Sequence, residues 1–412
     1  MKILVYGLNY DPEPVGIGKY TGELATWLAS SGHEVRVITA PPYFPQWRVS
    51  PPFKNSYSIH STANVLVYRC PLWIPRNPTG FKRLLHLLSF AISSFIPLLR
   101  QSGWNPDVII TIAPALFCAP GALIFSKIFC RRCKSWLHIQ DFELDAAFEL
   151  SLLNGKLLRR LAIYFEHFLL SSFDNVSAIS QSMLHSLHKK GVRPNRTIFF
   201  PNWVDLTVIS PSLLNNIPNP YRVQFDIPVS ATVLMYSGSM NKKQDFDLLV
   251  DVIHLLSDLP NLFWFFAGDG PSKSDFLRRT VHLSRVIHLP LQPVDRMNEW
   301  LNFADIHLLP QKSGTENLVL PSKLLGIFAS GKPVVATSFT GSELGLLVSQ
   351  AGACTSPGDP TAFADAIRRL INDPHYYFSA GQTARHLVEE YFEKGKVLSF
   401  FNQQLFPSQY DL

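Results

Sequence analysis

Two kinds of hydrophobic pattern alternate along most of the chain. Short apolar runs such as Lys2 to Leu8 and Glu34 to Ala40 have the length and composition of buried strands. Between them lie stretches with helical spacing, the first from about Gly18 to Ser31. Later runs of the strand type are VLVYRC, DVIITIA, KSWLHIQ and NVSAIS. This alternation predicts a parallel sheet with helices on both faces.

The same alternation starts again after a Pro/Asn-rich stretch, SPSLLNNIPNP. The new runs are TVLMYSG, LFWFFAGDG, VIHLP, ADIHLLP and PVVAT. We therefore predict an α/β protein of two Rossmann-like, doubly wound domains, 1–206 and 207–390, with a ligand-binding cleft between their sheet edges. The aromatic-rich end, 391–412, is expected to dock back on the first domain. The length of 412 residues, which exceeds a usual single core, agrees with two domains.

The stretch from Asp305 to Val334 reads as strand, loop, helix and strand. Pro310 ends the first strand, and Pro321 and Ser322 open the helix. Free backbone N–H groups at such a helix start suit a phosphate. Lys323 lies in the first turn, where a cation opposes the helix dipole, so a bound anion accounts for it better than helix stability does. A plain surface lysine is the alternative.

Glycines mark two further loops at predicted strand ends. Gly16 and Gly18 come directly before the first helix, and Gly238 follows a strand and precedes Lys242 and Lys243. Glycine lets a backbone approach a ligand closely, and the two lysines suit a diphosphate. A tight turn is the alternative for the first pair. The loop after the first strand does not read GxGxxG, which argues against a nicotinamide-dependent dehydrogenase.

Composition narrows the ligand classes. The chain has 37 basic and 31 acidic residues, a net charge of +6, and 47% hydrophobic residues. This balance favours phosphorylated ligands or an anionic membrane surface. Nucleic acid fits less well, because the basic residues are dispersed and no base-reading module is recognisable. Five cysteines argue against a disulfide framework, and Cys130 and Cys133 form a lone CxxC that we interpret as ordinary thiols rather than a zinc or redox site.

One helix is unusually apolar. Sixteen uncharged residues, LLHLLSFAISSFIPLL, lie between Arg83 and Arg100, fewer than the roughly 20 needed to span a bilayer. Such a helix either lies in a membrane interface with its basic ends near the headgroups, or is buried between the sheet and a neighbour. The chain opens on a strand rather than a secretory signal. We therefore expect a cytoplasmic protein, peripheral on the inner face of the cytoplasmic membrane.

The ordered blocks of the chain resemble a known family. They are MKILVYGLNYDPEPVGIGKYTGELATWLASSGHEVRVITAPPYFP, WLHIQDFELDAAFEL, PNWVD, MYSGSMNKKQDFDLL, FAGDGP and VLPSKLLGIFASGKPVVAT. In this order they are similar to the retaining, family 4 glycosyltransferases of GT-B fold, of the colanic-acid or exopolysaccharide type. The resemblance implies a nucleotide-sugar donor bound by the C-terminal domain, a lipid-linked or oligosaccharide acceptor bound by the N-terminal domain, retention of anomeric configuration, and no metal or other cofactor.

The resemblance also implies roles for individual residues. His138, Asp141 and Glu316 are the catalytic candidates, acting on hydroxyl groups or phosphate oxygens. The donor and its phosphates are expected at Gly16, Gly18, Gly238, Lys242, Lys243, Asn317, Leu318, Ser322 and Lys323. The alternatives are a hydrogen-bonded strand histidine for His138, a helix cap for Asp141 and a solvated loop charge for Glu316.

The chain departs from the family pattern at several positions. Many members carry two glutamates with seven residues between them in the last block, where this chain has Leu318 and Gly326. An arginine and a lysine that often follow the glycine of the YSG block are here Ser239 and Gln244. A catalytically degenerate scaffold and a nucleotide-sugar epimerase of the same fold therefore stay open as alternatives. The transferred sugar, nucleotide base, linkage, acceptor and oligomeric state cannot be read from the sequence.

Overall fold

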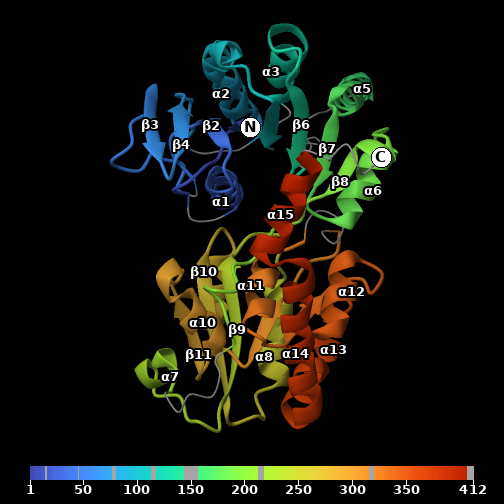
Figure 1. Cartoon of the computed structure of the whole chain (residues 1–412). Helices are drawn as coiled ribbons and strands as arrows, with labels where there is room; N and C mark the ends of the chain where they lie inside the picture. The colour runs from blue at the N-terminus through green and yellow to red at the C-terminus, as the bar shows by residue number, and fades with distance from the viewer. Residues whose placement is uncertain are drawn as a thin grey trace. The chain divides into compact units, whose positions relative to one another are not determined.

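The chain forms two compact units (Figure 1). The computed structural model describes residues 1–13, 16–44, 46–76, 80–112, 117–142, 156–211, 218–314 and 320–405. One unit comprises Met1–Pro201 with Leu398–Leu412, and the other comprises Asn202–Val397. The first stretch of the first unit ends at residue 201, where the sequence predicted 206. The chain returns to this unit at Leu398, where the sequence predicted 391. Each unit is built on its own sheet.

In the described part of the first unit, eight strands form one sheet with the order β3-β4-β2-β1-β5-β6-β7-β8. The strands are β1 (Lys2–Gly7), β2 (Glu34–Thr39), β3 (Ser58–Thr62), β4 (Val65–Arg69), β5 (Val108–Ile112), β6 (Lys134–Ile139), β7 (Asn175–Ala178) and β8 (Thr197–Phe199). Ile3 of β1 pairs with Val35 and Val108 on its two sides, both in parallel register. The central strands are buried and apolar, as parallel strands between two helix layers must be.

The prediction of a purely parallel first sheet was wrong at one edge. Strand β3 runs antiparallel to β4. Ala63 and Asn64, with φ of 49° and 62°, connect the two strands in the paired left-handed conformation that suits a two-residue hairpin. Because β3 is largely exposed, it lacks the apolar run that marked the other strands. Strand β8 and the second unit's β14 also went unpredicted.

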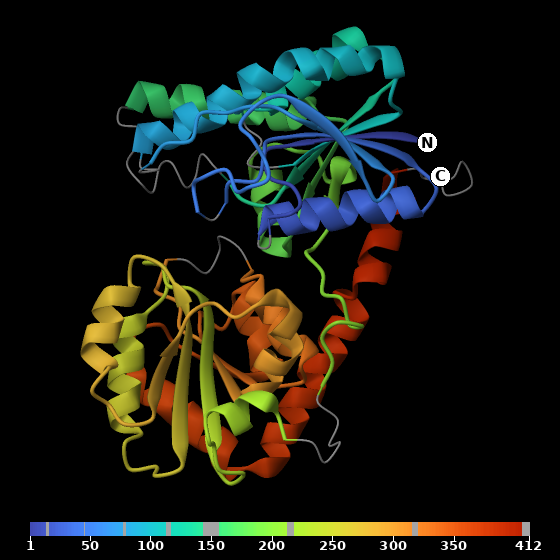
Figure 2. The ribbon, with the colours of Figure 1, turned by 90° about the vertical axis from the view of Figure 1, so that its left-hand side faces the viewer.

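Helices cover both faces of this sheet (Figure 2). On one face lies α1 (Ile17–Ser30); on the other lie α2 (Gly80–Arg100), α3 (Ala119–Ile124) and α5 (Lys156–Ser172). The π-helical turn η2 (Phe125–Phe129) continues α3, and α6 (Gln181–Lys189) precedes β8. A buried hydrogen bond of 2.7 Å between the Tyr6 and Ser94 hydroxyls ties α2 to β1.

The C-terminal helix α15 (Lys394–Leu405) packs on the first unit through an aromatic cluster. The Phe401 ring stacks on Phe200 at a centroid distance of 3.9 Å and meets Trp136 edge-on at 5.0 Å. Asn402 Oδ1 lies 2.9 Å from His33 Nε2. These contacts bind the end of the chain to strands β6 and β8 and to the turn before β2.

In the described part of the second unit, six parallel strands have the order β11-β10-β9-β12-β13-β14. They are β9 (Thr232–Ser239), β10 (Leu262–Asp269), β11 (Val286–Leu289), β12 (Ile306–Leu309), β13 (Val334–Thr337) and β14 (Gly352–Thr355). The helices are α7 (Pro220–Gln224), α8 (Phe246–Leu255), α9 (Lys273–Thr280), α10 (Met297–Phe303), α11 (Lys323–Ala329), α12 (Glu343–Gln350), α13 (Pro360–Asn372) and α14 (Pro374–Tyr391). The predicted succession of strand, loop, helix and strand from Asp305 to Val334 is confirmed as β12, α11 and β13.

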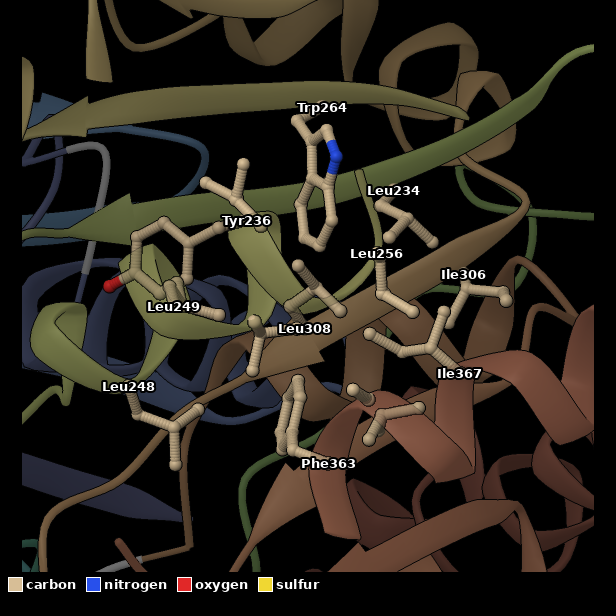
Figure 3. Close-up of a cluster of buried hydrophobic side chains, with 14 of the residues drawn as sticks. Leu234, Tyr236, Leu248, Leu249, Leu256, Trp264, Ile306, Leu308, Phe363 and Ile367 are labelled. Carbon is tan, nitrogen blue, oxygen red and sulfur yellow. The ribbon is translucent and has the colours of Figure 1, made fainter. Parts of the chain in front are cut away.

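A large apolar core holds β9 in place (Figure 3). Leu234 and Tyr236 of β9 pack with Trp264 of β10 and with Phe363 and Ile367 of α13, and all five are at most 3% exposed. Complete burial of such side chains contributes about 1.5 to 3 kcal/mol each. The loop that follows β9 therefore starts from a rigid strand.

We expect Phe401→Ala to lower the free energy of unfolding by about 3 kcal/mol, because it removes a ring that is 0% exposed and leaves a cavity between Phe200 and Trp136. The matched control is Phe400→Ala, whose ring is 47% exposed and should cost about 0.5 kcal/mol or less. Urea denaturation measures both. Equal losses in the two variants would contradict the docking of α15.

Candidate functional site

The second sheet reverses its strand order beside β9. From β9 the chain moves outward to β10 and β11, and then returns to place β12 on the other side of β9. The loops after β9 and β12 therefore diverge at the carboxyl edge of the sheet, which is where open α/β folds bind ligands. Helix α11, reached after β12, begins near this edge.

The most unusual group at this edge is the ammonium of Lys323. Its Nζ lies 3.9 Å from the centroid of the Tyr236 ring. The atom is shielded from solvent, although the residue as a whole is half-buried, and it has no hydrogen-bond partner among the described residues. Gly238 leaves room for it, since a Cβ at that position would lie 3.4 Å from Nζ. The structure thus brings together Gly238 and Lys323, which sequence analysis placed at the phosphates.

Burial lowers the pKa of Lys323 from 10.5 to about 7. The first turn of α11 adds the unfavourable end of the helix dipole. Contact with the Tyr236 ring offsets part of this cost, but a cation–π contact contributes only about 0.5 to 2 kcal/mol. A buried amine without an acceptor is destabilising, so its presence points to a ligand that supplies negative charge.

The loop after β9 owes its shape to close backbone approaches. The Tyr236 hydroxyl donates to Ser239 O at 2.5 Å, which fixes the ring face toward Lys323. Met240 N donates to Asp269 O at 2.8 Å, and a Cβ on Gly270 would lie only 2.5 Å from Met240 O. The glycines of FAGDG therefore let the loops after β9 and β10 pack on each other.

Two buried amides lie at the same edge and were not predicted as ligands. Gln244 and Gln311 pair across an isolated bridge, and each is less than 10% exposed. Their Oε1 atoms are buried and have no hydrogen-bond partner in the part of the chain that the structure describes. Thr337, at the end of β13, fixes the backbone of Gln311 through bonds of 2.5 and 2.7 Å. Since Gln244 stands where many relatives carry a lysine, that departure was the available signal.

The other predicted donor residues of this unit differ in how they are placed. Lys242 and Lys243 lie on the loop after β9 with exposed side chains, and Lys243 O accepts from Lys312 N at 2.9 Å. Ser322 is exposed at the start of α11, and its side chain caps no N–H group. Glu316, Asn317 and Leu318 lie outside the described residues.

Gly326, where many relatives carry a second glutamate, is closely packed on the side where a side chain would start. A Cβ at this position would lie 3.2 Å from Leu301 Cδ1. A side chain at this position would therefore point from α11 toward α10 and not into open solvent. The contact that a second glutamate makes in such relatives must come from another residue here or be missing.

His138, on β6 in the first unit, has hydrogen-bond partners at both ring nitrogens. It is 2% exposed, and burial lowers its pKa to about 3. Gln140 Nε2 donates to its Nε2 at 3.3 Å, and its Nδ1 lies 2.9 Å from the Ser177 hydroxyl. Both ring nitrogens thus have partners within the unit, which favours the structural alternative over a catalytic role. Asp141, two residues beyond β6, is half-buried, and its catalytic role stays a prediction.

The space beside Gly18 is filled by another side chain of the first unit, that of Glu13, and not left open for a phosphate. A Cβ on Gly18 would lie 2.7 Å from the Glu13 carboxylate. That carboxylate is 3% exposed and accepts from Tyr43 N and Phe44 N at 3.1 Å each and from Asn9 Nδ2 at 2.8 Å. An internal acid here disfavours a bound phosphate beside Gly18. Gly16 needs glycine for its φ of 66°, and nothing lies within 4 Å of its Cβ position.

Glu13 belongs to a buried cluster that sequence analysis missed. Arg69, at the end of β4, is 2% exposed and donates to Ala40 O at 2.7 Å and Asp11 O at 2.6 Å. Burial lowers the pKa of Arg69 to about 10 and raises that of Glu13 above its ordinary value. Together these two residues hold the loops after β1 and β2 at the carboxyl edge of the first sheet. The acid between two prolines, Pro12 and Pro14, was the sequence signal.

Comparison with known proteins agrees with this geometry. A family model described as a glycosyl transferase 4-like domain matches residues 15–203, and one described as glycosyl transferases group 1 matches residues 231–373. The chain is 40% identical over 408 residues to the putative colanic acid biosynthesis glycosyl transferase WcaI of Escherichia coli (strain K12), covering 97% of this chain and 98% of the relative.

Two solved structures share the architecture over nearly the whole chain. Sucrose-phosphate synthase from Thermosynechococcus elongatus has a TM-score of 0.73 at 16% identity, covering 98% of both chains. Anabaena HepE, solved in complex with UDP and glucose, has a TM-score of 0.68 at 17% identity, covering 98% of this chain and 99% of that one. The two parallel-sheet domains are therefore those of a GT-B fold. The chain belongs to the glycosyltransferase family that the two matching domain models describe, and it is a glycosyltransferase.

Proposed function

We propose that the protein transfers a sugar, with retention of anomeric configuration, from a nucleotide-sugar donor to a lipid-linked saccharide in exopolysaccharide assembly of the colanic-acid type. The observation that carries this proposal is the buried ammonium of Lys323 beside Gly238, which has no hydrogen-bond partner among the described residues. Likeness to WcaI supports the pathway class, and the UDP and glucose in the HepE complex support the donor class.

Lys323 receives the diphosphate in this proposal. When the bond between the anomeric carbon and the diphosphate oxygen breaks, negative charge grows on the leaving group, and a preorganised cation stabilises that charge. Bound phosphate raises the pKa of the Lys323 amine, so an amine that is partly neutral at pH 7 becomes fully charged. Lys242 and Lys243, on the loop after β9, add positive charge that is exposed to solvent.

Retention follows if the acceptor hydroxyl enters on the face that the diphosphate leaves. A new bond forms between the acceptor oxygen and the anomeric carbon, and the hydroxyl proton passes to an oxygen of the departing diphosphate. No protein nucleophile takes part in this scheme. Asp141 and Glu316 orient hydroxyl groups in the proposal, and the buried Gln244 and Gln311 amides offer oxygen atoms that no described residue donates to.

The acceptor belongs to the first unit in this proposal. The Glu13 and Arg69 cluster fixes the loops that would border it. A lipid-linked acceptor would hold the enzyme at a membrane, and we infer the inner face of the cytoplasmic membrane, where nucleotide sugars are available.

A non-catalytic scaffold is the second candidate, because one specific observation favours it. The position of the second family glutamate is Gly326, which has no carboxylate and whose Cβ position lies 3.2 Å from Leu301 Cδ1. A scaffold would bind a nucleotide sugar without turning it over in the presence of any acceptor.

Replacement of Lys323 by methionine should stabilise the ligand-free protein by on the order of 2 kcal/mol at neutral pH, since it keeps the side-chain length and removes a buried unpaired amine. The folded pKa, about 7, is lower than the ordinary 10.5, so the cost in wild type is full below pH 7 and fades as pH rises toward 10.5. Urea denaturation should therefore show a smaller stability difference between Lys323→Met and wild type at about pH 9.5 than at about pH 6.5. A variant less stable than wild type at the lower pH would contradict the burial argument.

A thermal-shift panel of GDP-, UDP- and dTDP-sugars should raise the melting temperature of the wild type with one nucleotide class. Lys323→Met should lose that shift and slow sugar transfer by about 100-fold or more, because the cation facing the leaving group is gone. The matched control is Lys243→Met, which alters an exposed lysine on the loop after β9 and should keep most of the shift. Full transfer activity in Lys323→Met would remove the phosphate assignment, and wild-type binding without turnover would favour the scaffold.

We propose further that transfer needs no metal ion, as the resemblance to the family implies. Activity measured after EDTA treatment should equal activity before it, because lysine charge rather than a cation bridge stabilises the diphosphate. Loss of activity in EDTA that Mg²⁺ or Mn²⁺ restores would show that a metal takes part.

A further inference from the structure

Exposed apolar side chains gather on three helical segments of the first unit. Of the thirty large hydrophobic side chains that are exposed in the described chain, five lie on α2, three on α3 and η2, and five on α5. Helices α2, α3 and α5 lie on the same face of the first sheet, so side chains that point away from the sheet share one outer surface (Figure 2). We call this surface the three-helix face; its exposed apolar residues are Phe81, Leu85, Leu88, Ile92, Ile96, Ile124, Ile128, Phe129, Leu161, Ile163, Tyr164, Phe165 and Phe168.

Helix α2 is divided lengthwise. Phe81, Ile92 and Ile96, at 69%, 67% and 60% exposure, lie on one stripe with helical spacing. The buried residues of the helix, which include Phe90 and Ser94, lie on the opposite stripe and pack toward the sheet. The exposed stripe therefore does not result from loose packing of the helix on the sheet. It is a second apolar face that the described residues of the first unit leave uncovered.

Within the described parts of the chain, this helix alone meets the length and composition expected of a membrane span. Its inner side, however, is bound to the domain: Ser94 bonds to Tyr6 at 2.7 Å, and Ser93 Oγ donates to Pro71 O at 2.5 Å. Removal of the helix from the sheet would break these bonds and expose the first core. A helix held in this way can lie along a bilayer surface but cannot cross it without unfolding the unit.

The charge of the three-helix face identifies its partner. The sequences of α2, α3, η2 and α5 contain seven basic residues and one acidic residue, Glu166. Glu166 is 5% exposed and is neutralised by Lys190 at 2.7 Å. Arg131 and Arg132, both exposed, follow directly after η2. Lys127 of η2 is paired with Asp174 at 2.7 Å, so the positive charge around the apolar surface comes from the other basic residues.

We propose that the three-helix face docks the enzyme flat on an anionic lipid bilayer, with its apolar side chains among the acyl chains and its arginines and lysines at the headgroups. A second copy of the chain is a poorer occupant, because two such faces would bring like charges together. The biological setting rests on the lipid-linked acceptor of the proposed function. The docking itself depends on the face alone.

The test is vesicle flotation with purified protein and liposomes of phosphatidylcholine, with and without phosphatidylglycerol. The wild type should float with the anionic vesicles, and added salt should weaken its binding. The double variant Ile92→Asp, Ile96→Asp should bind at least about tenfold more weakly, because it removes two apolar anchors and adds repulsion from the lipid. Both side chains are more than half exposed, so the fold should survive.

The matched control is Val223→Asp in the second unit, an apolar residue as exposed as Ile92, at 67%. It should leave vesicle binding unchanged. The nucleotide-sugar thermal shift should persist in the Ile92→Asp, Ile96→Asp double variant and in Val223→Asp. Failure of docking and failure of the proposed function are therefore distinguishable. The proposal is overturned if the wild type stays soluble with anionic vesicles, if the double variant floats as well as the wild type, or if light scattering shows a dimer that the double variant dissociates.

Discussion

The contact between the Lys323 ammonium and the face of the Tyr236 ring is the interaction on which the donor site depends. Three parts of the second unit produce it: the rigid strand β9, which fixes the ring; Gly238, which leaves space above it; and the start of α11, which delivers the lysine. None of the three stabilises a cation as well as water does. The pKa of about 7 expresses that imbalance, and the diphosphate of the proposed donor would raise it.

The first unit also carries a feature that is unfavourable in the free protein, but here the cause is exposed apolar surface and not a buried charge. The stripe of Phe81, Ile92 and Ile96 leaves apolar surface in water, which is unfavourable for an isolated protein and promotes aggregation. Both features are costly in the free enzyme, and in our proposals each gains a partner: an anion for Lys323 and a lipid surface for the helix stripe. A transferase that joins a charged, soluble donor to a lipid-linked acceptor needs both kinds of site.

Much of the fold could be predicted because buried parallel strands carry continuous apolar runs. Strands β1, β2 and β9 and helix α1 lie within a residue or two of their expected positions. Strand β3 escaped because an exposed edge strand has no such run, and its hairpin turn uses Ala63, a residue that does not signal a left-handed turn.

The site was less accessible to sequence reasoning, because it depends on which distant residues meet. The position of Lys323 in a helix start was readable, but its burial depends on Tyr236 and Gly238, more than eighty residues earlier in the chain. Gly18 looked like a ligand glycine, yet it serves Glu13, whose carboxylate fills the space. His138 stood at the expected strand end, but only the structure shows Ser177 and Gln140 at its two ring nitrogens.

The most direct test of the central claim is the pKa of the Lys323 amine, measured by NMR of its labelled side chain with and without a nucleoside diphosphate. Lys323→Met identifies the resonance. The account predicts a pKa near 7 in the free protein and a rise of about two units or more when the diphosphate binds. An amine that titrates near its ordinary 10.5, or one whose pKa the ligand leaves unchanged, would contradict the account.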